Sequence, residues 1–250
     1  IPQKMSLDGS ILSRLKFFLQ ALSDFVFPPV CCGCDEEIES GLICDSCRLL
    51  LFTSELGVCQ RCGRPCLPDE QICGLCGQEF SLSRVRAVGL YQPPFSRLIQ
   101  NLKYQGKTGL APILGGALAL LVRQDSELSR VDGVCAVPLH PARLRERGYN
   151  QAYLLAQVVA AVTGVTLLDP LVRRKNTRSQ IEMKDETARK RNVRDAFAVK
   201  PGVRFQGERL ILVDDVMTTG ATISAAAGKL LEAGAGAVMG LVLAAALVRK

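Results

Sequence analysis

The sequence predicts an α/β fold in which helices flank a parallel sheet, with a small cysteine-rich module in front of it. Strand-like and helix-like segments alternate from residue 84 onward, and ten of the eleven cysteines lie between Cys31 and Cys76. The 250 residues suffice for one medium α/β domain and a small appendage. We expect an amphipathic helix over residues 10–28, the cysteine module over 29–80 and the α/β domain over 84–250.

The first apolar segment, residues 11–27, carries leucines at helical spacing and is interrupted by charged residues. This pattern predicts an amphipathic helix that docks on the protein or on a partner and ends at Pro28 and Pro29. It is typical of neither a signal peptide nor a membrane span. The last apolar segment, residues 237–248, is also too short to cross a bilayer and predicts a core strand. We expect a cytoplasmic protein without a membrane span.

Eight of the clustered cysteines form four C-x-x-C pairs. Nine residues separate the first pair from the second, and ten residues separate the third pair from the fourth. Two such pairs complete the tetrahedral four-sulfur shell that Zn2+ accepts, and a shell closed by cysteine leaves no position for catalytic water. We therefore expect a double zinc ribbon with about two structural zinc ions. The predicted ligands are Cys31, Cys34, Cys44, Cys47, Cys59, Cys62, Cys73 and Cys76. Three other thiols are interpreted as small buried hydrophobic side chains, namely Cys32, Cys66 and Cys135.

The elements of the α/β domain follow one another closely. Strands are predicted over residues 84–91, 131–138, 165–169, 196–199, 209–215 and 237–247, and helices over 94–104, 150–164 and 221–236. The strands are short apolar runs, whereas the helices carry longer patterns, one of which ends at a glycine. Alternation of this kind indicates a parallel sheet covered by helices.

The stretch LILVDDVMTTGAT, residues 210–222, joins an apolar run to an acidic pair and a hydroxyl-rich loop. The run suits a strand covered on both faces, so Asp214 and Asp215 fall at its carboxyl end, where ligands bind in open α/β sheets. The next helix begins just after the loop, so backbone N–H groups and three hydroxyls converge as a phosphate monoester requires. The acidic pair suits vicinal sugar hydroxyls or Mg2+. A sugar with a 5-phosphate satisfies both halves.

Two nucleotide-binding patterns fail on spacing. The segment Gly106-Lys107-Thr108 resembles the end of a phosphate-binding P-loop but lacks the glycine required upstream. The glycines Gly234, Gly236 and Gly240 do not have the spacing of a dinucleotide fingerprint, and they precede a strand. Neither nucleoside-triphosphate hydrolysis nor NAD binding is supported.

Residues 210–222 resemble the motif with which type I phosphoribosyltransferases bind phosphoribosyl pyrophosphate (PRPP). The wider chain, nearly everything after Pro28, is similar to the ComF family of competence-associated, phosphoribosyltransferase-like proteins. The matching features are the C-x-x-C pairs, Leu102-Lys103-Tyr104-x-Gly106, Val137-Pro138-Leu139-His140-Pro141-x-Arg143, Arg147-Gly148-Tyr149-Asn150-Gln151, Thr177-x-x-Gln180 and Arg191-Asn192-Val193-x-x-Ala196-Phe197. The resemblance implies a type I phosphoribosyltransferase-like fold, PRPP bound with Mg2+, and a link to DNA uptake.

Carried over to this sequence, the family pattern assigns Asp214 and Asp215 as the catalytic pair. It assigns PRPP contacts to Met217, Thr218, Thr219, Gly220, Ala221 and Thr222, and a pyrophosphate loop to Pro138, Leu139 and His140. Arg143 and Arg147 follow that loop closely enough to clamp diphosphate oxygens. His140 is either a ligand contact or a loop residue that satisfies its own backbone, and Lys103 is either a phosphate contact or a solvated helix end.

The net charge of +7 is concentrated in residues 139–194, which hold twelve Lys or Arg and five acidic residues. This excess is consistent with a polyanionic ligand. Within it, residues 173–194 are either a flexible flap that closes over PRPP or an exposed basic linker. The flap would bring Arg178, Gln180 and Arg191 onto the ligand.

Two hypotheses about function follow. The first is an enzyme, a glycosyltransferase that transfers phosphoribosyl from PRPP to an acceptor for which the sequence carries no signature. The second is a non-catalytic PRPP-binding scaffold or sensor that holds single-stranded DNA or competence partners. Fold and motif alone do not decide between them.

Overall fold

The structure is a computed structural model and describes residues 28–52, 59, 61–63, 81–175 and 195–246. The predicted helix over residues 10–28 lies almost wholly outside these residues. So do Cys66, Cys73, Cys76, Arg178, Gln180 and Arg191.

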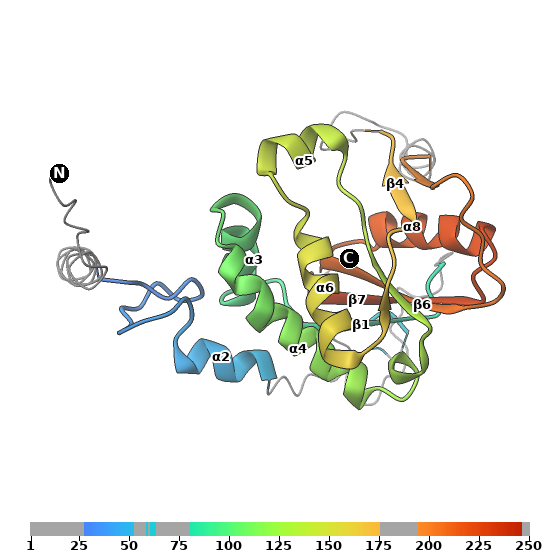
Figure 1. The fold of residues 1–250 in the computed structure, drawn as a ribbon. Coiled ribbons are helices and arrows are strands. Elements are labelled where there is room, and N and C mark those ends of the chain that lie inside the picture. The colour runs from blue at the N-terminus through green and yellow to red at the C-terminus, as the bar shows by residue number, and fades with distance from the viewer. Residues whose placement is uncertain (1–27, 53–58, 60, 64–80, 176–194, 247–250) are drawn as a thin grey trace, which may run out of the picture.

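The described helices are α2 (Asp45–Phe52), α3 (Phe95–Tyr104), α4 (Ala111–Gln124), α5 (Pro141–Arg147), α6 (Gln151–Thr163) and α8 (Ala221–Glu232), with the 3-10 turns η1 (Thr108–Leu110) and η2 (Leu128–Arg130). The strands are β1 (Arg84–Leu90), β2 (Gly133–Ala136), β3 (Thr166–Leu167), β4 (Leu171–Arg173), β5 (Phe197–Val199), β6 (Arg209–Met217) and β7 (Ala237–Ala245). Figure 1 shows their arrangement.

The main sheet has five strands in the order β1-β7-β6-β2-β3, and all neighbouring pairs are parallel. β4 and β5 form a separate antiparallel ribbon. β6 lies at the centre of the sheet, where Val213 faces Ala136 of β2 and Asp214 faces Val242 of β7. The predicted α/β class with a parallel sheet is confirmed.

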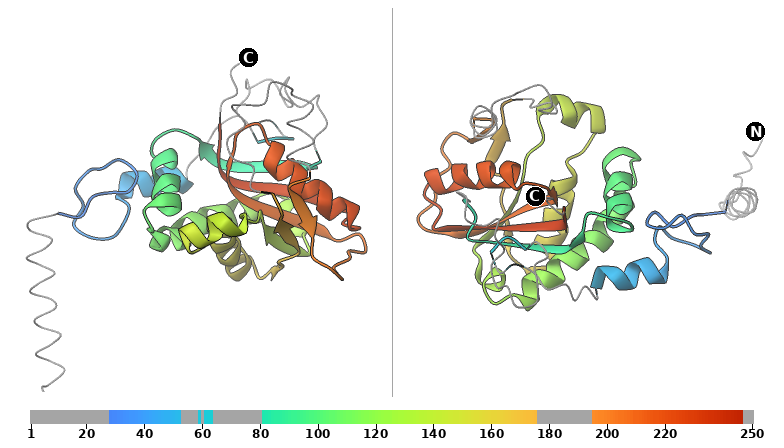
Figure 2. Two further views of the ribbon diagram at one scale, coloured as in Figure 1. Left: turned by 90° about the horizontal axis from the view of Figure 1, so that it is seen from above. Right: turned by 180° about the vertical axis from the view of Figure 1, so that it is seen from behind.

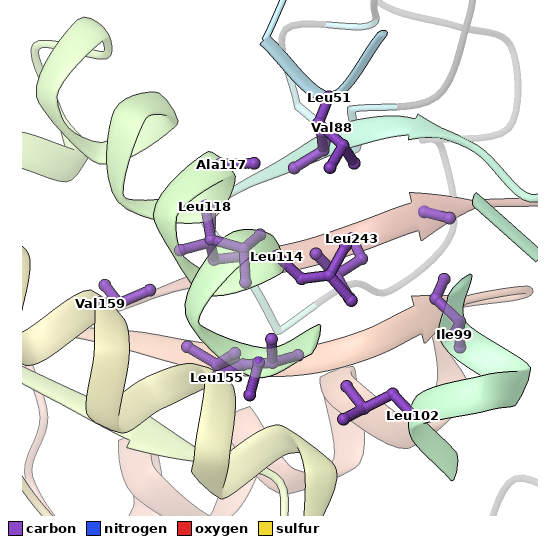
Figure 3. Close-up of a cluster of buried hydrophobic side chains, with 14 of the residues drawn as sticks. Leu51, Val88, Ile99, Leu102, Leu114, Ala117, Leu118, Leu155, Val159 and Leu243 are labelled. Carbon is purple, nitrogen blue, oxygen red and sulfur yellow. The ribbon is translucent and has the colours of Figure 1, made fainter. Parts of the chain in front are cut away.

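Helices cover both faces of the sheet, because alternate residues of each strand point to opposite sides. Ile211 and Val213 of β6 join an apolar core with α3, α4 and α6, part of which Figure 3 shows. Leu210 and Leu212 join a second core with α8 and the β4–β5 ribbon. The carboxyl end of β6 therefore lies between the helices on one face of the sheet and α8 with the β4–β5 ribbon on the other.

The first cysteine module, residues 28–52, packs against the first of these cores. Cys31, Cys47 and Leu51 are buried in it together with Leu114 and Leu118 of α4, and Leu51 lies beside Val88 of β1 (Figure 3). Figures 1 and 2 both show the module next to α3. The module is therefore attached to the α/β domain through apolar contacts as well as through the chain.

Within the residues that the structure describes, no helix has the length and apolar character needed to cross a bilayer. The final apolar segment forms β7, which is buried along nearly all of its length, in agreement with the predicted core strand.

Candidate functional site

The first four predicted metal ligands converge on one point. The sulfur atoms of Cys31, Cys34, Cys44 and Cys47 all lie within 4.8 Å of one another. The Cys34 and Cys44 sulfurs are 3.7 Å apart, close to the edge of about 3.8 Å that a tetrahedron with Zn–S bonds near 2.3 Å requires. The cluster thus has the donor set and spacing of a structural zinc site.

Backbone N–H groups around the cluster favour thiolates. Gly33 and Cys44 each donate to the Cys31 sulfur at 3.3 Å, and Cys47 donates to the Cys44 sulfur at 3.4 Å. Burial raises the pKa of Cys31, but these donors outweigh it and lower the pKa to about 6. Burial and the neighbouring thiols raise the pKa of Cys47. A bound divalent cation would favour loss of the remaining thiol protons, so that all four cysteines bind as thiolates.

Of the second predicted shell, the structure describes Cys59 and Cys62, both buried. Their turn lies at the start of β1, where Val85 donates from its backbone N–H to the carbonyl of Arg61 at 2.7 Å. Gly63 closes the turn with φ of 67°, and a Cβ there would lie 2.7 Å from the Val85 carbonyl oxygen. Cys32 and Cys135 are buried, as expected for small apolar side chains, and burial raises the pKa of Cys135 to about 12.

The acidic pair lies at the carboxyl end of β6, where consecutive side chains point to opposite faces of the sheet. Asp215 is 3% exposed and points to the side of α3. Asp214 is half-buried and accepts a hydrogen bond of 2.8 Å from the backbone N–H of Asp215. Burial and the charge of Asp215 raise the pKa of Asp214 to about 7.

Lys103, at the end of α3, pairs with Asp215. Its Nζ lies 2.7 Å from Asp215 Oδ1, and the two side chains are 19% and 4% exposed. Burial alone lowers the pKa of Lys103, but Asp215 and then Asp214 raise it above the ordinary value. Asp215 Oδ2 is buried and has no hydrogen-bond partner among the described residues. Neither sequence interpretation of Lys103, phosphate contact or solvated helix end, included this ion pair.

Arg173, at the end of β4, begins the segment 173–194 that was interpreted as a flap or a basic linker, but the sequence prediction gave it no role of its own. Its guanidinium lies over the Phe197 ring, 5.2 Å from the centroid. Burial and the nearby charge of Arg143 lower its pKa, and the opposing effect of Asp214 offsets only part of this. Arg173 therefore stands between one predicted carboxylate and one predicted diphosphate clamp. Its sequence signals are the basic segment that it begins and the short apolar run before it, Leu171 and Val172.

The predicted phosphate loop connects β6 to α8. Gly220 has φ of 86° and ψ of 0°, a left-handed conformation that suits glycine, and it caps the first turn of α8. The Thr219 hydroxyl accepts from the backbone N–H of Ala221 at 3.3 Å. Thr218 and Thr219 are exposed, Thr222 is half-buried, and Met217 is buried beneath them. The loop thus presents two threonine side chains at the start of a helix, beside the acidic pair.

The predicted pyrophosphate loop follows β2, which lies next to β6 in the sheet. Val137 donates to the Val213 carbonyl at 2.9 Å, which brings Pro138 and Leu139 to the same edge as the acidic pair. His140 caps α5, because its Nδ1 accepts from the backbone N–H of Ala142 at 3.2 Å. This contact corresponds to the interpretation of His140 as a residue that satisfies its own backbone.

The two predicted diphosphate clamps differ in their surroundings. Arg143 is close enough to Arg173 to lower the pKa of Arg173. Arg147 instead lies over the Tyr104 ring, 5.1 Å from the centroid, and donates to Gln151. The structure therefore brings Arg143 near Arg173 and gives Arg147 partners on α3 and α6.

Asp215 does not fit a directly bound Mg2+ ion. The ammonium of Lys103 already lies 2.7 Å from its carboxylate and would repel a second cation there. The unpartnered Asp215 Oδ2 fits a neutral hydroxyl donor better.

The sequence has clear relatives. The double zinc ribbon domain family matches residues 22–77. The chain is 32% identical over 214 residues to the DNA utilization protein YhgH of Escherichia coli (strain K12), covering 78% of this chain and 93% of that protein. It is 32% identical over 203 residues to competence protein F of Haemophilus influenzae (78% and 81%) and 28% identical over 202 residues to competence protein ComFC of Bacillus subtilis (77% and 79%).

Solved structures give weaker matches. The allosteric regulatory enzyme of purine biosynthesis is 21% identical with a TM-score of 0.37, and the match covers 53% of this chain but only 26% of that one. A purine phosphoribosyltransferase from Pyrococcus horikoshii is 12% identical with a TM-score of 0.32, covering 55% and 83%. The sequence relatives are the stronger finding.

Proposed function

Because the chain belongs to the ComF family of competence proteins, we propose that it binds PRPP at the carboxyl edge of its sheet and serves DNA uptake. The observation that carries this proposal is the acidic pair at the end of β6, with Lys103 at one face and Arg173 near the other. The loop with Thr218, Thr219 and Gly220 follows it directly.

Each part of PRPP has a matching feature. The start of α8 and the threonine hydroxyls suit the 5-phosphate. Asp214 and the open oxygen of Asp215 suit the ribose hydroxyls, which donate hydrogen bonds to carboxylates. Arg143, Arg173 and the loop after β2 suit the diphosphate. The negative charge of the diphosphate would be offset by these arginines and by Mg2+ bound with it.

Phosphoribosyl transfer breaks the bond between ribose C1 and the diphosphate, and positive charge develops on the sugar in the transition state. The residues proposed here would hold the sugar through its hydroxyls and stabilise the negative charge on the leaving group.

The first test compares two glycines. Gly220 and Gly202 have φ of 86° and 80°, and Gly202 lies in a turn with open space around it. Replacing either with Ala forces a left-handed alanine, which costs about 1–2 kcal/mol of stability. Only Gly220→Ala is expected to weaken PRPP binding, by tenfold or more in calorimetry. Equal PRPP affinity in the two variants would contradict the proposed phosphate loop.

The second test removes the carboxylates. Asp214→Asn combined with Asp215→Asn keeps the shape of both side chains but replaces one acceptor oxygen of each with a donor nitrogen. We expect PRPP binding to be lost while circular dichroism still shows the folded sheet. Unchanged PRPP affinity in this variant would mean that the ribose binds elsewhere.

A non-catalytic role is the second candidate, and the names of the relatives favour it. In that role, the protein is a PRPP-binding scaffold or sensor that holds single-stranded DNA or competence partners. Diphosphate release in the presence of candidate acceptors separates the two functions. DNA binding through the basic excess of residues 139–194 should be weak, with a log–log salt slope of roughly −0.7 per phosphate neutralised. Changing Arg189, Lys190 and Arg191 together to Ala should weaken it further.

A further inference from the structure

Helix α3 connects the first cysteine module to the acidic pair. One side of this ten-residue helix, Phe95, Leu98, Ile99 and Leu102, is buried against the sheet. Figures 1 and 2 show α3 between the module and the sheet. Two polar residues near its end, Asn101 and Lys103, face different parts of the molecule.

Asn101 binds the backbone of the module. Its Nδ2 donates to the carbonyl of Cys32 at 3.1 Å and to the carbonyl of Arg97, one helical turn back, at 3.0 Å. Both N–H bonds of the amide therefore donate, one to the module and one to the helix. The side chain joins the module to the helix backbone.

The Cys32 carbonyl belongs to the turn that carries the first predicted metal ligands. Cys32 lies between the predicted ligands Cys31 and Cys34, and its own N–H donates to the Leu42 carbonyl at 2.8 Å. The turn is packed tightly on α3, because a Cβ on Gly33 would lie 2.9 Å from Pro94 Cβ. A change in the turn would therefore displace the acceptor of Asn101 or the start of the helix.

Lys103 lies two residues after Asn101 on the same rigid helix, and it places its ammonium 2.7 Å from Asp215. The end of the helix is held from another side as well, since the Tyr149 hydroxyl donates to the Leu102 carbonyl. A shift of α3 would thus change the distance between Lys103 and Asp215 directly.

We propose that Asn101 is a positioning residue through which the metal-loaded first cysteine module holds Lys103 against Asp215. Loading of that module then sets PRPP affinity, and by reciprocity PRPP strengthens metal binding. The second cysteine module, which holds the predicted ligands Cys59, Cys62, Cys73 and Cys76, contacts the start of β1, where Val85 donates to the Arg61 carbonyl. Among the described residues it lacks a connection to α3 like that of Asn101. The alternative is that the apolar side of α3 positions Lys103 without help from Asn101.

The consequence for PRPP rests on the proposed function, so the first experiment does not use PRPP. The rate at which an amine-acylating reagent labels Lys103 is measured by mass spectrometry, with the exposed Lys107 as internal standard. In the zinc-loaded protein, Lys103 should be protected by its ion pair. Asn101→Ala should keep its zinc and raise the labelling rate about fivefold or more, the lower end for coupled sites.

Two controls separate this effect from general loosening. Cys62→Ser alters the second module and should leave Lys103 labelling unchanged. Arg97→Ala removes only an exposed ion pair with Asp35 and should change it little. Unchanged Lys103 labelling in Asn101→Ala would overturn the proposal, as would an equal increase in Cys62→Ser.

The second experiment measures PRPP affinity with and without zinc in wild type and in Asn101→Ala. Removal of zinc should weaken PRPP binding about fivefold or more in wild type and clearly less in Asn101→Ala. Equal loss in both proteins would overturn the role of Asn101. If the zinc-loaded wild type binds no PRPP while labelling still responds to Asn101→Ala, the positioning role stands and the proposed function fails.

Discussion

The first cysteine cluster and the acidic pair both bring acidic groups close together, but they balance the charge differently. The cluster takes its thiols from one short segment and surrounds them with backbone N–H groups, so it depends on an added cation. The acidic pair is faced by basic side chains from other elements, Lys103 of α3 and Arg173 of β4. We therefore expect the module to need a metal ion to fold, whereas protein cations already face the acidic pair.

Removal of the metal should have the largest effect on stability, and it should act mainly on the cysteine module. Structural zinc contributes on the order of 10 kcal/mol to the folding of a small module, so Cys31→Ser with Cys34→Ser should unfold residues 28–52. The sheet should remain folded with a lower melting temperature, because Cys31 and Leu51 share its core. Calorimetry and elemental analysis test this, with about two zinc ions expected per wild-type chain. A wild type without zinc would contradict the metal assignment.

Lys103→Met tests whether the acidic pair depends on its own cation. Methionine keeps most of the length of the side chain but leaves Asp215 buried without its partner, which typically costs about 3–5 kcal/mol. Urea unfolding should show this loss, and the double change with Asp215→Asn should recover part of it. A loss below about 1 kcal/mol would indicate that water replaces the lysine.

The raised pKa of Asp214 predicts opposite pH effects on stability and binding. Because its folded pKa is about 7, Asp214 favours the folded state at low pH, and this contribution is lost as pH rises from about 4 to 7. We expect a decrease of up to about 4 kcal/mol that is absent in Asp214→Asn. PRPP affinity should rise over pH 6 to 8 as the carboxylate forms. The same rise in Asp214→Asn would assign it to the phosphates of the ligand.

The smallest expected effect concerns the exposed ion pair that joins the two regions. Arg97 and Asp35 are 43% and 63% exposed, so Arg97→Ala should cost less than about 1 kcal/mol of unfolding free energy. The loss should also shrink in high salt. A larger loss in urea unfolding would mean that the module is fastened to α3 mainly by charge.

The sequence predicted the core strands well but missed helix α4. β6 and β7 are uninterrupted apolar runs, and such runs suit a buried parallel strand. α4 was not predicted, because its apolar residues occur on every side and it contains two adjacent glycines. In the structure, a Cβ on Gly115 would lie 2.5 Å from Val158 Cβ, so glycine permits the close packing of α4 on α6. The reason for a glycine at position 115 is thus a tertiary contact, which the local sequence does not show.

The candidate site shows the same limit. Asp214, Asp215 and the loop to Thr222 are contiguous, so their common position could be predicted from a strand followed by a helix. The Lys103 pairing joins residues more than a hundred positions apart, and the Arg173 position depends on a ribbon whose second strand follows a long basic segment. No local pattern reports such contacts.

The strand order has a consequence for synthesis of the chain. β1 pairs only with β7 in the described sheet, and β7 also completes the pairing of β6. At typical rates of translation, β7 is made roughly 7–30 s after β1, and until then both strands lack that partner. Exposed apolar strand edges of this kind recruit other chains. A chain that ends at residue 236 should therefore aggregate in light-scattering measurements, whereas the full chain should not.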